Sequence, residues 1–136
     1  MCAIAGLIEI EYDKKILQGM LNTMLHRGPD GNGIYTQGRC ALLHSRLSII
    51  DPVGGTQPMK LVHDGEVYII VYNGELYNTE EIRKELCALG HTFESHSDTE
   101  VVLHAFAQWK EATLSKLNGI FAFGVWLENA QKLFLA

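Results

Sequence analysis

The sequence predicts an α+β protein whose strands form largely antiparallel sheets. Strand-like and helix-like segments follow one another in mixed order, without regular strand–helix–strand repeats. At least one pair of strand-like runs is joined by a short glycine-containing turn typical of a hairpin. A length of 136 residues, with 47% hydrophobic and 20% charged residues, fits one domain with a single core.

The first half of the chain contains the predicted N-terminal strand and one helix. Residues 2–10 form an apolar run typical of a largely buried strand. Asp13 is expected to cap a helix over 14–25, because apolar residues recur there at helical spacing. Three glycines and a proline predict a loop over 26–33. Further strands are expected at 33–36 and 40–50.

The second half begins with a predicted irregular loop over 51–59. A hairpin follows, with its turn at 63–65 and its second strand over 67–72, because Asp-Gly between two apolar runs is a turn signal. A helix capped by Asn78 or Thr79 is expected to end at Gly90. Beyond it we expect a short strand at 92–96, a helix opening at 97–100, a buried strand at 120–127 and a last strand at 132–136.

Charge and composition argue against several classes of partner. The formal net charge is −5 and no basic run exceeds Lys14-Lys15, which gives no footprint for nucleic acid or an anionic membrane. The sequence has neither a signal-peptide layout nor an apolar run near the ~20 residues of a transmembrane helix, so we expect a cytoplasmic protein. The cysteines and six histidines lack metal-ligand spacing, so no metal site is expected, and Cys40 and Cys87 are expected to be buried.

Cys2 is the first candidate for chemistry. If Met1 is removed, Cys2 carries both a thiol and a free α-amine, and an α-amine titrates near pH 8 in model peptides (about 7.7–8.0). One residue would then supply both a nucleophile and its base. A small residue at this position is equally consistent with the start of a buried strand.

Several polar residues further along the chain are candidates for binding or catalysis, and some of them also have a purely structural interpretation. Arg46 lies in an apolar run, so its guanidinium needs either an internal carboxylate such as Asp51 or Asp98, or the carboxylate of a ligand. Asn73-Gly74 follows a β-branched strand and precedes a helix, so a side-chain amide and a backbone N–H could form an oxyanion hole. Glu75 beside them could receive an ammonium group, whereas Asp98 also reads as an ordinary helix cap.

Seven stretches together resemble a known family. They occur in the family's order along the whole chain and read MCAIAG, HRGPDGNG, RLSIID, GGTQPM, YNGELYN, SDTEVVLHAF and LNGIFAFGVW. The chain is similar to the class II glutamine amidotransferase domain, of the N-terminal nucleophile type, at the front of glutamine-hydrolysing asparagine synthetases. The RLSIID and GGTQPM stretches favour asparagine synthetases over other amidotransferases of this class.

The resemblance implies a fold, an activity and a set of roles. The fold would be two largely antiparallel sheets sandwiched between helices, and the activity would be hydrolysis of L-glutamine to glutamate and ammonia. It implies Cys2 as nucleophile with its α-amine as base, Asn73 and Gly74 as oxyanion hole, and Arg46, Glu75 and Asp98 as ligands of the glutamine backbone groups. No cofactor is implied in residues 1–136, whereas ATP and Mg²⁺ would belong to a synthetase domain that uses the ammonia to make asparagine from aspartate.

The resemblance also implies that the family continues beyond Ala136. We therefore expect a truncated glutaminase domain over 1–136 without its synthetase domain, with an open sheet edge that could favour a homo-oligomer. Two other hypotheses are a non-catalytic fragment that binds glutamine or a partner, and an N-terminal nucleophile hydrolase acting on another amide. Position 3 is alanine where the family usually has glycine, and retention of Met1 would convert the α-amine into an amide.

Overall fold

The structure, a computed structural model, describes residues 2–48 and 54–136. The elements in chain order are β1 (Ala3–Ile8), α1 (Lys14–Met24), β2 (Gly31–Gln37), β3 (Cys40–Arg46), β4 (Met59–His63), β5 (Glu66–Leu76), α2 (Thr79–Ala88), α3 (Asp98–Trp109), the 3₁₀ helix η1 (Lys110–Ser115), β6 (Gly119–Leu127) and β7 (Lys132–Leu135).

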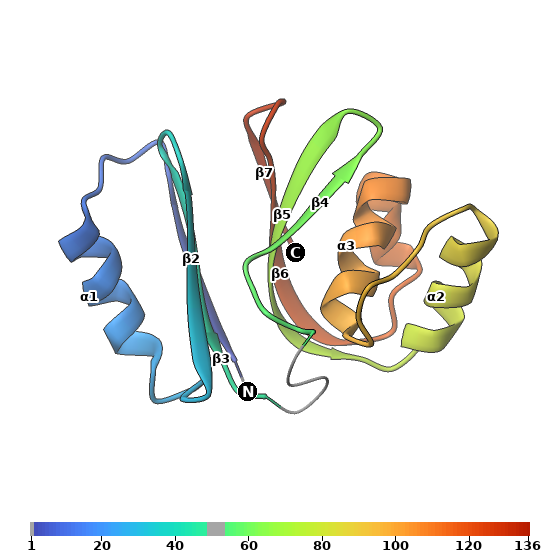
Figure 1. Ribbon diagram of the computed structural model, residues 1–136, viewed down its shortest axis with the longest axis horizontal. Helices are drawn as coiled ribbons and strands as arrows, with labels where there is room; N and C mark the ends of the chain where they lie inside the picture. The colour runs from blue at the N-terminus through green and yellow to red at the C-terminus, as the bar shows by residue number, and fades with distance from the viewer. Residues whose placement is uncertain (1, 49–53) are drawn as a thin grey trace.

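The strands form two antiparallel sheets that lie face to face between helices (Figure 1). One sheet has the order β1-β3-β2 and is covered by α1. The other has the order β4-β5-β6-β7 and is covered by α2 and α3. The α+β class and the layered arrangement of two sheets between helices are therefore confirmed.

Each interface between layers has its own apolar cluster. Leu17 and Leu21 of α1 pack against Ala41 and Leu43 of β3. Between the sheets, β3, β5 and β6 contribute Cys40, Leu42, Ile69, Val71 and Trp126. The largest cluster joins the outer face of β5 and β6 to α2 and α3, and includes Tyr68, Ile70, Tyr72, Leu76, Leu86, Val102 and Phe106. Neighbouring residues of β5 thus face opposite layers, as strand geometry requires.

Two predicted elements near the middle of the chain differ from the structure. The strand expected to end at Tyr72 continues to Leu76, because β6 pairs with it from Tyr68 as far as Leu76, which lies opposite Gly119. Residues 92–96 form no strand. Their backbone is instead held by Glu100, whose carboxylate accepts hydrogen bonds from the N–H groups of Glu94 and Ser95, both 2.8 Å long.

Helix caps account for most of the correctly predicted boundaries. The Asp13 side chain accepts a hydrogen bond from the Ile16 N–H at the start of α1, as expected. Gly90 follows α2 with φ of 97°, a backbone angle that favours glycine. Asn78 precedes α2 but its side chain does not cap it, because that amide bonds to the backbone of Lys116 and Asn118.

The cysteine prediction is half right. Cys40 is buried between the sheets, where burial raises the pKa of its thiol to about 11. Cys87, on α2, is exposed, so its expected burial is wrong: the apolar face of α2 is formed by Ile82 and Leu86, and Cys87 lies on the other side.

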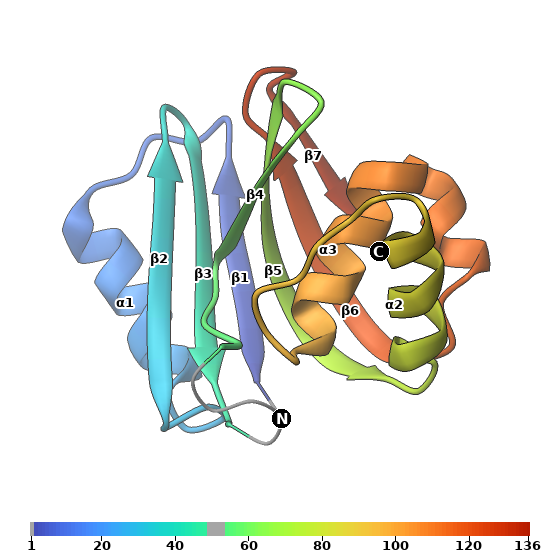
Figure 2. The same cartoon turned by 45° about the vertical axis from the view of Figure 1, so that its right-hand side comes forward.

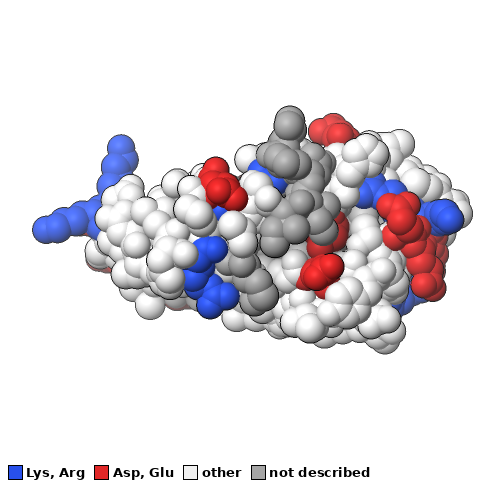
Figure 3. Space-filling model, turned by 90° about the horizontal axis from the view of Figure 1, so that it is seen from below, with Lys and Arg blue, Asp and Glu red and all other residues white. Residues whose placement is uncertain are grey.

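The described surface has no large basic area on the side seen from below. Lys and Arg side chains there are interspersed with acidic ones, and acidic groups lie near the middle (Figure 3). Among the helices in the described ranges, none is long and apolar enough to cross a membrane.

Candidate active site

A cavity of about 260 Å³ lies where the two sheets meet at the lower end of the molecule (Figure 2). There β1 begins, β3 and β5 end, and α3 begins. All six residues singled out from the sequence line this cavity: Cys2, Arg46, Asn73, Gly74, Glu75 and Asp98. The fold therefore brings together residues as far apart in the sequence as Cys2 and Asp98.

Cys2 is held at the cavity by the strand that follows it. Ala3 pairs with Ser45 in the β1–β3 ladder, which fixes Cys2 beside the end of β3. Its Sγ atom lies 3.4 Å from the backbone N of Leu47, which donates to it, and 3.6 Å from the backbone oxygen of the same residue. The side chain is half-buried, so a small molecule in the cavity can reach the sulfur.

At the end of β5, side chains and backbone N–H groups point in different directions because of strand alternation. Ile69 and Val71 face the other sheet, so the side chains of Asn73 and Glu75 follow on the same face, toward β1 and β3. The backbone N–H groups of Tyr72 and Leu76 point away from β6 and donate to Gln57 and Asp98. Gly74 lies between them, so its N–H faces the same side. β4 pairs with β5 only as far as Ile70, which leaves this edge open to the cavity.

Gly74 has no room for a side chain. A Cβ atom at this position would lie 2.5 Å from the backbone oxygen of Ile120 and 2.6 Å from the Cα of Phe121. Glycine here allows β5 to remain paired with β6 while its opposite edge opens toward the cavity.

The Asn73 amide retains unused hydrogen-bonding capacity. Its Oδ1 atom is buried, and no described residue donates to it. Buried polar atoms are nearly always satisfied, so an unpaired one in a cavity indicates a place for a ligand or water.

Asp98 is the first residue of α3, but it is not the cap. Ser97 caps the helix by accepting a hydrogen bond from the Glu100 N–H. The Asp98 carboxylate instead turns to β5, where Oδ2 accepts hydrogen bonds from the Tyr72 hydroxyl at 3.1 Å and the Leu76 N–H at 3.2 Å. The reading of Asp98 as an ordinary cap is therefore wrong, since the neighbouring serine takes that place.

Charges of both signs line the cavity. Arg46 is 8% exposed and ends β3, while Asp98 is 8% exposed and Glu75 is exposed on β5. Asp51, one of the carboxylates considered for Arg46, lies outside the described residues. A cation, two anions, a thiol and an amide around one small space suit a zwitterionic ligand that carries an amide.

Three more residues near this site carry functional interest that the sequence did not indicate. Tyr72 and Gln57 line the cavity and hydrogen-bond to its other residues. His44 lies two residues before Arg46 on β3, and neither of its ring nitrogens makes a hydrogen bond of good geometry within 2–48 and 54–136. Burial lowers the pKa of His44 to about 4, a looser contact with the Tyr72 backbone opposes this, and the Arg46 charge adds to it. In the sequence all three look like ordinary core or loop residues.

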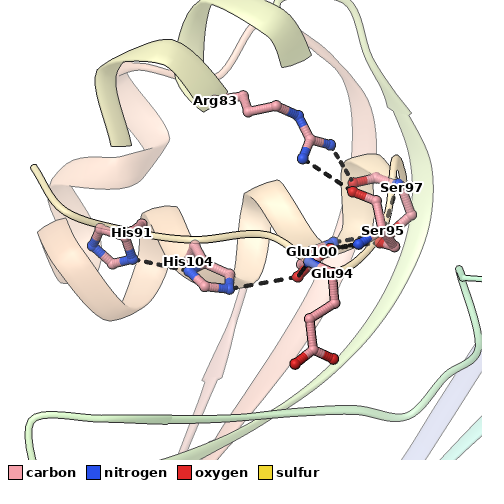
Figure 4. A network of polar contacts seen from close by, with 7 residues as sticks. All are labelled: Arg83, His91, Glu94, Ser95, Ser97, Glu100 and His104. Atoms are coloured by element: carbon pink, nitrogen blue, oxygen red, sulfur yellow. Dashed lines mark hydrogen bonds and ion pairs between the residues drawn. The ribbon is translucent and has the colours of Figure 1, made fainter. Parts of the chain in front are cut away.

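A second, larger cavity of about 680 Å³ lies on the other side of the α3 N-terminal turns. It contains His63, His91 and His104, with Glu100 beneath them. His91 Nδ1 lies 2.9 Å from His104 Nδ1, and His104 Nε2 lies 3.8 Å from Glu100 Oε1 (Figure 4). Among the described residues, no group of three or more His, Cys, Asp or Glu side chains is arranged to hold a metal ion.

Comparison with known proteins gives a consistent result. A sequence profile described as "Glutamine amidotransferase domain" matches residues 1–136. Asparagine synthetase [glutamine-hydrolyzing] 3 of Bacillus subtilis is 45% identical over 140 residues, covering 100% of this chain and 23% of that protein. The Zea mays asparagine synthetase [glutamine-hydrolyzing] is 37% identical, covering 98% and 22%. The chain thus spans about a quarter of the length of these curated relatives.

A solved structure shares the fold. Glutamine phosphoribosylpyrophosphate amidotransferase from B. subtilis, complexed with ADP and GMP, superposes with a TM-score of 0.79 at 22% sequence identity. The match covers 94% of this chain and 35% of that chain. At this identity the likeness concerns the arrangement of strands and helices alone.

Proposed function

The chain belongs to the glutamine amidotransferase domain family, and on this basis we propose that its 260 Å³ cavity hydrolyses L-glutamine to glutamate and ammonia. The observation that carries the proposal is that a thiol just before β1 lines one cavity together with an amide, a glycine edge, a guanidinium and two carboxylates from β3, β5 and α3. Neither a non-catalytic fragment nor a hydrolase of other amides is favoured by the comparisons.

The proposed chemistry is acyl transfer through Cys2. With Met1 removed, the α-amine takes the thiol proton, and the thiolate attacks the carbon of the glutamine side-chain amide. The oxyanion that forms is stabilised by the Asn73 side chain and the Gly74 N–H. The C–N bond then breaks, the nitrogen takes the proton back and leaves as ammonia, and water cleaves the thioester to release glutamate and the thiol.

Substrate selection in this proposal depends on charge. The Arg46 guanidinium holds the α-carboxylate through its two parallel N–H groups, and the carboxylates of Glu75 and Asp98 hold the α-ammonium. Support comes from the opposite signs of these side chains around a space of about 260 Å³. An amide without the amino-acid end would lose both contacts and bind more weakly.

For a protein of the relatives' length that contains this domain, we propose the role that the names of those relatives suggest. The ammonia would pass to a synthetase domain that makes asparagine from aspartate, with ATP and Mg²⁺ bound there and no cofactor required in residues 1–136. A catalytic Cys2 thiol must remain reduced, which is consistent with a cytoplasmic location.

The test is ammonia release from glutamine by the chain with Met1 removed. Cys2→Ala should reduce kcat by at least ~10³-fold, because no other group replaces the nucleophile. Cys87→Ala, which removes an exposed thiol on α2, is the matched control and should retain full activity. Equal rates for Cys2→Ala and the parent chain would rule out Cys2 as the nucleophile.

A further inference from the structure

We propose that Tyr72 is a positioning residue that orients the Asp98 carboxylate toward the ammonium group of the substrate. Gln57 supports it by fixing the position of Tyr72 on β5 relative to α3. The inference rests on the proposed glutamine site and names two residues that determine its preference for an amino acid. Both residues line the cavity and are nearly buried, with exposures of 2% for Tyr72 and 9% for Gln57.

The first step concerns the two oxygens of Asp98. Among the described residues, the Tyr72 hydroxyl and the Leu76 N–H both donate to the same atom, Oδ2. Two donors on one oxygen fix the plane of the carboxylate and satisfy that oxygen. Oδ1 is thereby left as the atom that can accept from a ligand, in a side chain that lines the cavity.

The second step concerns why a tyrosine suits this position. Its ring packs in the apolar cluster between β5 and α3, so the hydroxyl is delivered from a rigid and dry environment. Burial, followed by the Asp98 charge, raises the pKa of Tyr72 above its ordinary value, so the hydroxyl remains a donor. A neutral donor orients the carboxylate without cancelling the negative charge that an ammonium group needs, as a lysine or arginine would do.

The third step concerns Gln57, which joins β5 to the first turn of α3. Its Oε1 accepts the Tyr72 N–H at 2.6 Å, and its Nε2 donates to the Thr99 hydroxyl at 3.1 Å. If β4 began earlier than Met59, its backbone would accept the hydrogen bond from the Tyr72 N–H; the Gln57 side-chain amide accepts that bond instead. Tyr72 and Asp98 are therefore held at a fixed separation directly by their own hydrogen bond and indirectly by the two contacts through which Gln57 bridges β5 and α3.

The test compares two substrates that differ only at the ammonium group. L-Glutamine has it, whereas glutaric acid monoamide has the same amide and carboxylate without it. Tyr72→Phe keeps the ring and removes only the hydroxyl. The matched control is Tyr68→Phe, because Tyr68 is also 2% exposed on the same face of β5, but its hydroxyl bonds to Lys110, away from the cavity.

Tyr72→Phe should weaken glutamine binding by about 10-fold, the effect typical of losing a hydrogen bond to a charged group. Binding is measured by calorimetry on Met1-free chains carrying Cys2→Ala, which cannot turn glutamine over. In chains with Cys2 intact, the same change should raise KM for glutamine with little effect on kcat. It should change kcat/KM for the monoamide less than twofold. Tyr68→Phe should leave kcat/KM unchanged for both substrates.

Gln57→Met, which removes both amide contacts and retains the side-chain length, is a second variant. It too should weaken binding of glutamine more than it affects the monoamide. Equal losses for both substrates, or unchanged glutamine binding by Tyr72→Phe, would overturn the inference while leaving the proposed function standing. If the Cys2→Ala chain does not bind glutamine at all, the proposed function itself fails and the inference fails with it.

Discussion

The two cavities beside the first turns of α3 differ in how far their polar groups are already satisfied. In the larger one, His91 pairs with His104 and Gln108, while Glu100 accepts hydrogen bonds from the backbone and hydroxyl of the 94–95 segment (Figure 4). In the smaller one, Asn73 has a buried oxygen without a donor among described residues, and Asp98 lines the cavity with its hydrogen bonds to Tyr72 and Leu76 both on Oδ2.

This difference explains why the smaller cavity is the better candidate for chemistry. Groups that saturate one another stabilise a loop and have little capacity left for a ligand. Groups held in place by some contacts, with other atoms unpaired, are prepared to bind something else. Volume alone would favour the larger cavity, since about 680 Å³ exceeds about 260 Å³.

The comparison can be tested most strongly at Asn73. Asn73→Ala should slow glutamine hydrolysis by ~10²–10³-fold, the usual cost of losing one oxyanion donor. The free energy of unfolding should change little, because the amide oxygen has no partner within the described residues to lose. Ammonia release and urea denaturation measure the two quantities. A variant that loses stability but keeps its rate would place Asn73 among the structural groups.

The histidines should make stability depend on pH. Burial, followed by the charge of His91, lowers the pKa of His104 to about 4, with Glu100 opposing this and His63 and Arg83 adding to it. The pKa of His44 is also lowered to about 4, mainly by burial. Because the unfolded chain takes up these protons more readily, stability present above pH 6.5 should be lost between pH 6.5 and 4, by about 1.4 kcal/mol per pKa unit at each site.

Urea denaturation at several pH values measures this effect. His104→Gln should flatten the slope, since it removes one of the two depressed groups and retains a polar side chain. A parent chain whose unfolding free energy is constant from pH 7 to pH 4.5 would contradict the burial argument.

The smallest expected effect is that of Glu100→Gln. The change keeps the shape but removes the charge that strengthens the bonds to Glu94 and Ser95, so unfolding should become easier by about 1–2 kcal/mol. The KM for glutamine should stay within twofold, because Asp98 is positioned from β5 rather than from the 94–95 segment. A large rise in KM would show that the two cavities are coupled through α3.

Patterns that the chain displays predicted the α+β class and singled out the six lining residues, whereas the layered arrangement of two sheets was an implication of the family resemblance. Apolar spacing identified α1 and β6, and Asp13 identified the start of a helix. The identity of the site depended on motif resemblance, and the structure brings those motifs to one cavity. The roles assigned to Cys2, Asn73 and Asp98 remain predictions.

The misses have different physical causes. A strand is expected over residues 92–96, but the Glu100 carboxylate accepts hydrogen bonds from the N–H groups of Glu94 and Ser95. Tyr72 has the sequence context of a core tyrosine, and only its contact with Asp98, 26 positions away, shows a second use. The contact between Tyr72 and Asp98 depends on how β5 and α3 pack together, which no local pattern encodes.

The alternation along the end of β5 also bears on how this protein can change during evolution. Odd positions 73 and 75 present side chains to the cavity. Even positions 72, 74 and 76 present backbone N–H groups to the edge of β5 that faces away from β6. A substitution at position 73 or 75 changes one side chain at the cavity, whereas a side chain at position 74 would collide with the backbone of β6. A single inserted or deleted residue would exchange the two sets of positions at once, so the length of this part of β5 is constrained even more strongly than its composition.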